Sequence, residues 1–403
     1  MHRVLVEEKK WISERRFLHA LNFCMLLPGP EAQQLATYVG WLLNGIWGGL
    51  VAGGLFVLPG AVAIMALSVV YVKFGAVGAV AGAFFGLKAA VMAIVVQAIQ
   101  RLGARALQSD ASRAVAVAAF MALFVLHTPF PVVVLVAGFA GLIDARARAF
   151  GFTARSGRES EADNLTPIAE RHSGAQTLRV AALFLALWLA PTAALILLFG
   201  RDDVYARIAM FFSKMAVVSF GGAYAALSYV AQQAVEDFHW LNASEMLTGL
   251  GMAETTPGPL IMVVQFVGFV AAYRHPGSLA PLVAGSLGGV LATYVTFAPS
   301  FLWIFAAAPY VERLRANSAL AGALAAISAA VVGVIANLAL FFGLRFLFHN
   351  LWTPPGLTVE LPVFASLDVE ALSLSVGAFA ALRLGLAPTL LLCTIAGLAL
   401  RSL

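Results

Sequence analysis

Two Pro-Gly-Pro motifs are the residues whose types and spacing most clearly allow this chain to bind a ligand. One is Pro28-Gly29-Pro30, the other is Pro257-Gly258-Pro259, and both lie within long apolar runs. A proline inside a helix removes a backbone donor and clashes with the carbonyl four residues earlier, whereas glycine lets the chain turn at little steric cost. The second proline suits the first position of a new helix. Each motif therefore predicts a helix, a break and a second helix whose free N–H groups could hold an anion.

Uncharged polar side chains near the two breaks could add hydrogen bonds to such an anion. Gln34 and Gln265 follow the breaks and carry amide donors, while Tyr224 and Thr256 carry hydroxyl groups. The two glutamines could equally bond a neighbouring helix, and hydroxyl groups such as these more often do so than contact a ligand. The binding residues predicted outside the two motifs are Gln34, Lys88, Lys214, Gly221, Gly222, Tyr224, Thr256 and Gln265.

Four ionisable side chains lie in or next to apolar sequence, where a charge is costly and is a functional candidate by default. Lys88 is predicted to hold the anion, whereas Lys214 lies close enough to a span end to reach the membrane surface instead. A carboxylate beside an anion repels it and protonation relieves that repulsion, so Glu254 is predicted to couple a proton to binding. Glu31 is interpreted instead as an N-terminal acid stabilised by the helix dipole.

The composition is that of a polytopic membrane protein. Of the 403 residues, 61% are hydrophobic and only 11% are charged, whereas soluble domains carry about 25% charged residues. Several uncharged stretches are long enough for a membrane span, which takes about 20 residues. The net charge of +5 is assigned to cytoplasmic loops rather than to nucleic-acid binding. The predicted fold is therefore all-helical, with about 10 spans or half-spans.

Sites for a metal, a cofactor or a catalysed reaction are not predicted. Cys24 and Cys393 lie in apolar sequence and are interpreted as small packing residues. The histidines do not form metal-ligand spacing, and the sequence contains neither a phosphate-binding loop nor a nucleophile with its base. A membrane-embedded enzyme is therefore the less supported class. The N-terminus carries charges where a cleavable signal would be apolar.

The chain is predicted to contain two repeats, at residues 1–143 and 180–403, joined by a polar linker at 144–179. Trp11 precedes Pro28 by the same number of residues as Trp240 precedes Pro257. Paired broken helices in two halves of a chain are typical of secondary transporters, whereas a channel usually shows one continuous pore-lining pattern. The start of the first repeat is basic and that of the second is acidic, which predicts opposite orientations across the membrane.

Several motifs, in this order, resemble the chromate ion transporter family in its long two-domain form. The matching stretches are Leu26–Pro30, Leu58–Gly60, Ser219–Gly222, Ala253–Pro259 and Gln265–Gly268. The resemblance implies a multi-pass carrier of the bacterial inner membrane that exports chromate, driven by the proton gradient, with sulfate as a close analogue. It also implies a Phe-Gly-Gly helix before Met1, so that either the start lies upstream or one span has been lost.

The alternatives are a sulfate or other anion carrier, or an anion channel, and a homodimer is an arrangement that the sequence leaves open. Whichever anion is carried, the two breaks are expected to meet near the membrane midplane in one polar cavity, with Lys88 and Glu254 reaching toward it. Each unpaired backbone group costs several kcal/mol in hydrocarbon, so two breaks that faced lipid separately would be very unfavourable.

Overall fold

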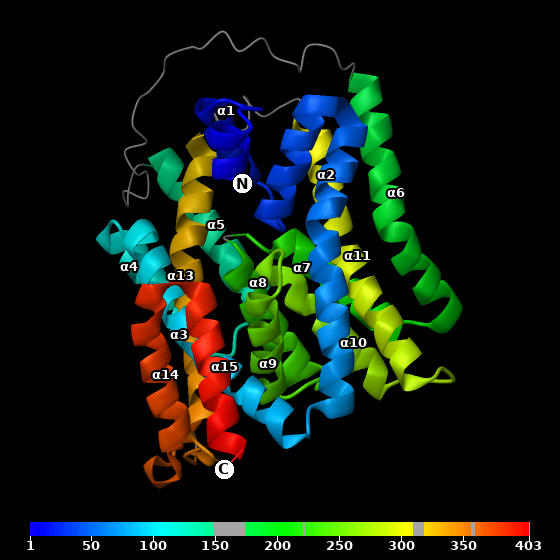
Figure 1. Cartoon of the computed structure of the whole chain (residues 1–403). Helices are drawn as coiled ribbons and strands as arrows, with labels where there is room; N and C mark the ends of the chain where they lie inside the picture. The colour runs from blue at the N-terminus through cyan, green and yellow to red at the C-terminus, as the bar shows by residue number, and fades with distance from the viewer. Residues whose placement is uncertain (148–173, 221, 309–317, 356–358, 403) are drawn as a thin grey trace.

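The computed structural model describes residues 1–147, 174–220, 222–308, 318–355 and 359–402, and these are almost entirely helical (Figure 1). Five of the described helices are long and apolar enough to cross a membrane, and three shorter apolar helices accompany them. The all-helical, multi-pass prediction is therefore confirmed. The five long helices are α2 (Glu31–Phe74), α3 (Gly78–Ala106), α6 (Gly174–Phe199), α11 (Pro281–Ala307) and α13 (Ser318–Leu347).

The remaining described elements are short helices, helical turns and one small β-hairpin. The helices are α1 (Glu14–Cys24), α4 (Asp110–Phe124), α5 (Phe130–Ala147), α7 (Val204–Val218), α8 (Ala223–Ala231), α9 (Ala243–Thr255), α10 (Val263–Arg274), α14 (Val369–Ala381) and α15 (Leu386–Ser402). The turns are η1 (Arg3–Glu8), η3 (Gln232–Asp237), η4 (Leu260–Met262), η6 (Phe364–Ser366) and η7 (Leu382–Leu384), and β1 (Leu351–Trp352) pairs antiparallel with β2 (Leu361–Pro362). Residues 148–173 of the predicted linker, and Gly221, lie outside the described residues.

The first Pro-Gly-Pro motif separates α1 from α2, and α2 itself folds back on its own N-terminal part. Backbone angles leave the helical region at Asn44 and Gly45, so the segments on either side form a hairpin. Gly40 and Gly48 contact each other closely across this hairpin, and a Cβ on either would collide with the carbonyl of the other. Small residues thus let the two segments pack at short range, as is common between membrane helices.

The second Pro-Gly-Pro motif is flanked by elements in the same order as those around the first motif. The motif separates α9 from η4 and α10, and α10 forms a hairpin with α11. Gly268 and Gly288 are in close contact there, and a Cβ on Gly268 would lie 2.7 Å from the carbonyl oxygen of Gly288. Before α1 and before α9 there is a π-helical turn, followed by a non-glycine residue with positive φ, Lys10 or His239.

The long helices α3 and α13 each pack on two short helices from the other half of the chain. Helix α3 packs on α14 and α15, and α13 packs on α4 and α5 (Figure 1). Glycines again lie at both contacts. A Cβ on Gly82 would lie 2.8 Å from the carbonyl oxygen of Gly397, and a Cβ on Gly141 would lie still closer to the carbonyl oxygen of Gly322. The short helices of each half therefore pack on a long helix of the other half.

Candidate anion-binding site

Both Pro-Gly-Pro breaks border one small cavity at the centre of the helices. Its volume is about 160 Å³, and its walls come from residues 29–32 and 259–261, from the α7–α8 connection, and from Thr296 of α11. Water in the liquid occupies about 30 Å³ per molecule, so the cavity has room for one small tetrahedral anion. This geometry agrees with the expectation that the two breaks share a cavity. The position of the cavity near the membrane midplane stays a prediction.

Three helices begin at the wall of this cavity, which is the feature that suits it to an anion. These are α2 after Pro30, α8 after Gly222, and η4 with α10 after Pro259, and none of the three has a side-chain cap. The first N–H groups of a helix have no partner within the helix and carry partial positive charge. Among the other described helices, α1, α4, α7, α9 and α14 are capped by the side chains of Ser13, Ser109, Asp203, Asn242 and Asp368, whereas α3 and α11 also lack a side-chain cap.

A glycine with positive φ lies just before each of these three helices. The φ angles are +109° at Gly29, +94° at Gly222 and +133° at Gly258. Residues with a Cβ rarely adopt such angles, whereas glycine does so at little cost. The glycines therefore allow the abrupt change of direction that aims each helix N-terminus at the cavity.

Each break is held in place by an element from the other half of the chain. The N–H of Gly29 donates to the carbonyl of Ser219 at the end of α7, at 3.0 Å. The amide Nε2 of Gln34 donates to the carbonyl of Pro28, at 2.7 Å, and so stiffens the first break from within. The second break packs on α2, where a Cβ on Gly60 would lie 2.8 Å from the carbonyl oxygen of Pro257.

Buried polar atoms without a hydrogen-bond partner lie beside the first break. Within the described part of the chain these include Oε1 of Gln34, Oγ of Ser300 and both amide atoms of Gln33, and all three residues are fully buried. A Cβ on Gly29 would lie 3.2 Å from Nε2 of Gln34 and 3.6 Å from Oγ of Ser300, so these two side chains stand directly behind the cavity wall. Buried polar groups are normally satisfied, so these unpartnered atoms are free to hydrogen-bond a further group.

The two predicted lysines do not line the cavity. The Nζ atom of Lys88 donates to Oγ of Ser244 at the start of α9, at 2.7 Å, and Lys214 is exposed on α7. Lys214 does not face the cavity because of its position on α7, where the adjacent residue, Met215, is the one that lines the cavity. The lining contains no lysine or arginine, and Glu31 is its one charged residue.

The other predicted side chains also lie outside the cavity lining. The amide of Gln265 bonds to the carbonyl of Ala61 at 2.8 Å and to the hydroxyl of Thr293 at 2.9 Å. The hydroxyl of Thr256 donates to the carbonyl of Ala253, and that of Tyr224 donates to the Glu254 carboxylate at 2.9 Å. These side chains therefore make contacts between or within helices, and Gly221 lies outside the described residues.

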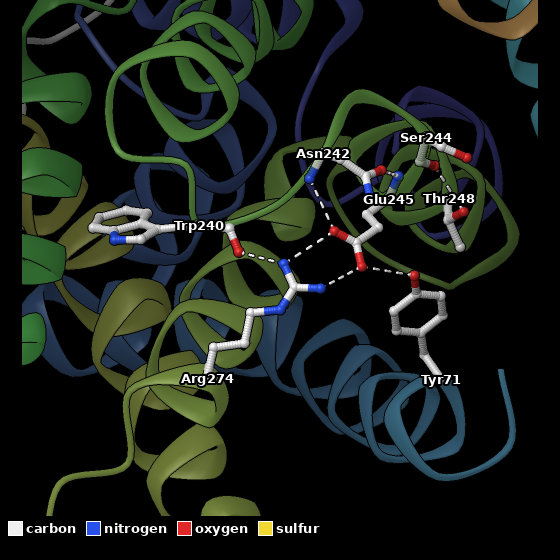
Figure 2. A network of polar contacts seen from close by, with 7 residues as sticks. All are labelled: Tyr71, Trp240, Asn242, Ser244, Glu245, Thr248 and Arg274. Atoms are coloured by element: carbon white, nitrogen blue, oxygen red, sulfur yellow. Dashed lines mark hydrogen bonds and ion pairs between the residues drawn. The ribbon is translucent and has the colours of Figure 1, made fainter. Parts of the chain in front are cut away.

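A second polar network joins the start of α9 to the end of α10 (Figure 2), and none of its residues lines the cavity. The carboxylate of Glu245 accepts hydrogen bonds from the guanidinium of Arg274 and from the hydroxyl of Tyr71. It also caps its own helix by accepting from the N–H of Asn242, whose side chain accepts from the N–H of Glu245. This network ties the start of α9 to the ends of α2 and α10, and so positions the second break.

Sequence reasoning missed the cavity residues that carry no distinctive motif. Thr296 lines the cavity, and Ser300 follows one turn later on the same helix. Their spacing of four residues within an apolar run places two hydroxyls on one helix face, which is the signal that could have found them. Ala223 and Ala226 likewise line the cavity, and small residues in a membrane helix are too common to be singled out.

An all-helical membrane protein with paired helix breaks around one small cavity is typical of an ion transporter. Comparison with known families agrees with this class. The model of the chromate transporter family matches residues 1–142 and 206–400, so this chain belongs to the chromate transporter family. The family is one of transporters and not of enzymes, which confirms the prediction that the chain is a transporter rather than a membrane-embedded enzyme.

Individual relatives are similar over most of the chain. A chromate transport protein from Pseudomonas aeruginosa is 30% identical over 378 residues, which cover 91% of this chain and 80% of the relative. A chromate transport protein from Cupriavidus metallidurans is 28% identical over 335 residues, covering 83% of this chain and 74% of the relative. An uncharacterized transporter from Methanocaldococcus jannaschii is 22% identical over 344 residues, 85% of this chain and 79% of the relative. No solved structure matches the chain significantly.

Proposed function

We propose that this chain is a secondary carrier that moves chromate out of the cell across the bacterial inner membrane, coupled to protons, with sulfate as a competing analogue. The observation that carries the proposal is the convergence of three uncapped helix N-termini on one cavity. The matching family, and two relatives that are named chromate transport proteins, support the choice of chromate among the tetrahedral oxyanions.

The cavity can hold a dianion without binding it too tightly. A helix N-terminus stabilises an anion by about 0.3–2 kcal/mol, depending on burial, and three such ends act together here. Because the lining has no lysine or arginine, the substrate does not form an ion pair from which it would leave slowly. Moderate binding suits a carrier, whose substrate must be released on the opposite side.

We also propose that residues 1–143 and 180–403 are repeats of opposite orientation, joined by residues 144–179. The shared order of turn, capped helix, break and hairpin supports this proposal. In Figure 1, α1 lies toward the upper end of the molecule and α9 toward the lower end, so the two broken helices approach the cavity from opposite ends. Rocking of such elements around a fixed site would expose the cavity to each side in turn.

Export agrees with the electrical driving force on an anion. Moving one elementary charge across a potential of 100 mV is worth about 2.3 kcal/mol, and a negative interior favours the exit of anions. A pathway for a dianion is therefore driven outward by the membrane potential, even where a proton travels with it.

The proposed function is tested by reconstituting the full chain in liposomes and measuring radiolabelled chromate flux. We expect saturable uptake, acceleration by unlabelled chromate on the opposite side, and competition by sulfate. Flux that rises linearly with concentration and shows no such acceleration would identify a channel instead. Absence of chromate flux, with sulfate flux present, would assign the chain to sulfate.

A further inference from the structure

The acidic residue that faces the cavity is Glu31, and not Glu254. Glu31 follows the first break directly and forms part of the cavity wall. Within the described part of the chain it has no ion pair and no hydrogen-bonded side-chain partner. In contrast, Glu254 accepts a hydrogen bond from Tyr224 and is not part of the wall. A carboxyl group that faces a site built for an anion needs a physical explanation.

The groups around Glu31 do not neutralise it. Cys24 of α1 is a titratable group that interacts with Glu31 electrostatically, and its thiol carries no positive charge. The cavity residues contributed by α7, α8, η4 and α11 include no titratable side chain. While the cavity is empty, the helix N-terminus favours the ionised form of Glu31, and the partial burial of its side chain opposes it. When an anion enters, the same N–H groups bind the anion, and an ionised Glu31 lies a few ångströms from two further negative charges.

We propose that Glu31 takes up one proton when the oxyanion binds and that the proton and the anion cross the membrane together. The inference rests on the proposed function and adds to it the residue and the direction of coupling. Anion binding favours protonated Glu31, and by linkage protonation favours anion binding to the same extent. One dianion and one proton thus move in the same direction, with a net charge of −1.

The buried polar atoms behind the cavity wall fit this role. A protonated carboxyl has an O–H that must donate to an acceptor, and an ionised carboxylate has no such need. Gln34 and Ser300, fully buried beside Gly29, have an amide oxygen and a hydroxyl oxygen without a donor among the described residues. In this proposal, one of these oxygens accepts from the O–H of protonated Glu31.

The test uses the full chain in liposomes, with a pH gradient, no initial chromate gradient, and the potential held at zero by potassium and valinomycin. Wild-type protein should accumulate radiolabelled chromate on the alkaline side. Glu31→Gln should exchange labelled for unlabelled chromate within about threefold of the wild-type rate but should no longer accumulate it. Glu370→Gln, which changes an exposed acid in the first turn of α14, controls for the loss of a helix-terminal charge and should behave as wild type.

Several outcomes would overturn the inference. If Glu31→Gln still accumulates chromate, the coupled proton is carried by chromate itself or by another residue. If only Glu254→Gln fails to accumulate chromate, the coupling belongs to Glu254. If Glu31→Gln shows no exchange, equilibrium dialysis of the solubilised protein decides the matter. Wild-type affinity for chromate should fall as the pH rises, and the variant should lack this slope, whereas an unchanged slope rejects Glu31. Absence of flux in the wild type would instead reject the proposed function.

Discussion

Replacement of Gly222 by valine is expected to lower chromate flux at least tenfold. Gly222 lines the cavity and precedes α8, and a Cβ at this position would have no protein atom within 4 Å. The valine side chain would therefore project into open space at the cavity wall, where it would displace the anion from the α8 N-terminus. The φ of +94° also strains any residue with a Cβ, by about 1–3 kcal/mol.

The chain offers a matched control for that strain. Gly200, after α6, has a φ of +88° and likewise has no atom within 4 Å of a Cβ, but it is remote from the cavity lining. Gly200→Val should lose a similar amount of stability and keep its flux. Thermal unfolding and liposome flux of both variants, at equal reconstituted amounts, separate the two effects. Equal flux in the two variants would show that the Gly222 position is not part of the anion path.

A second large effect is expected from Gly60→Val on α2. A Cβ on Gly60 would lie 2.8 Å from the carbonyl oxygen of Pro257, so the larger side chain must push the second break away from α2. Displacement of the break moves the N-terminus of η4 out of the cavity wall. Misplacement by about 1 Å can cost roughly 100-fold where geometry is decisive, and we expect flux to fall at least tenfold.

Gly54→Val on the same helix is the control for this change. Gly54 is exposed and has no atom within 4 Å of a Cβ, while the effect of valine on helix propensity is the same as at Gly60. Its flux should remain within about twofold of wild type. If Gly60→Val transports as well as Gly54→Val, the packing of the second break on α2 does not position the site.

The breaks were predictable because they depend on local chemistry. Proline and glycine restrict the backbone wherever they occur, so Pro28–Pro30 and Pro257–Pro259 could be read as helix ends from the sequence. Their convergence could be expected from the cost of unpaired backbone groups in hydrocarbon. The third helix N-terminus, at Gly222, was not predicted, because glycine without proline does not mark a helix start in an apolar run, and Gly222 was named only as a binding residue.

The roles of single charged side chains were not predictable in the same way. Lys88, Lys214 and Glu254 were selected because they lie in or near apolar spans, and the sequence does not say which helix face turns toward the cavity. Lys214 and Met215 are neighbours, yet only Met215 borders the cavity. Glu31 was assigned to the helix dipole, because its exposure to a cavity depends on α8, η4 and α11, which are distant in the sequence.

We expect the oxyanion to bind where the three helices begin, and anomalous diffraction at the chromium edge tests this binding site most directly. Crystals of the protein soaked in chromate should show a chromium peak inside the cavity. The peak should lie within reach of the N–H groups that follow Pro30, Gly222 and Pro259, and it should be absent from Gly222→Val crystals. A chromium peak beside Lys88 or Lys214, with an empty cavity between the breaks, would show that the oxyanion does not bind where the three helices begin.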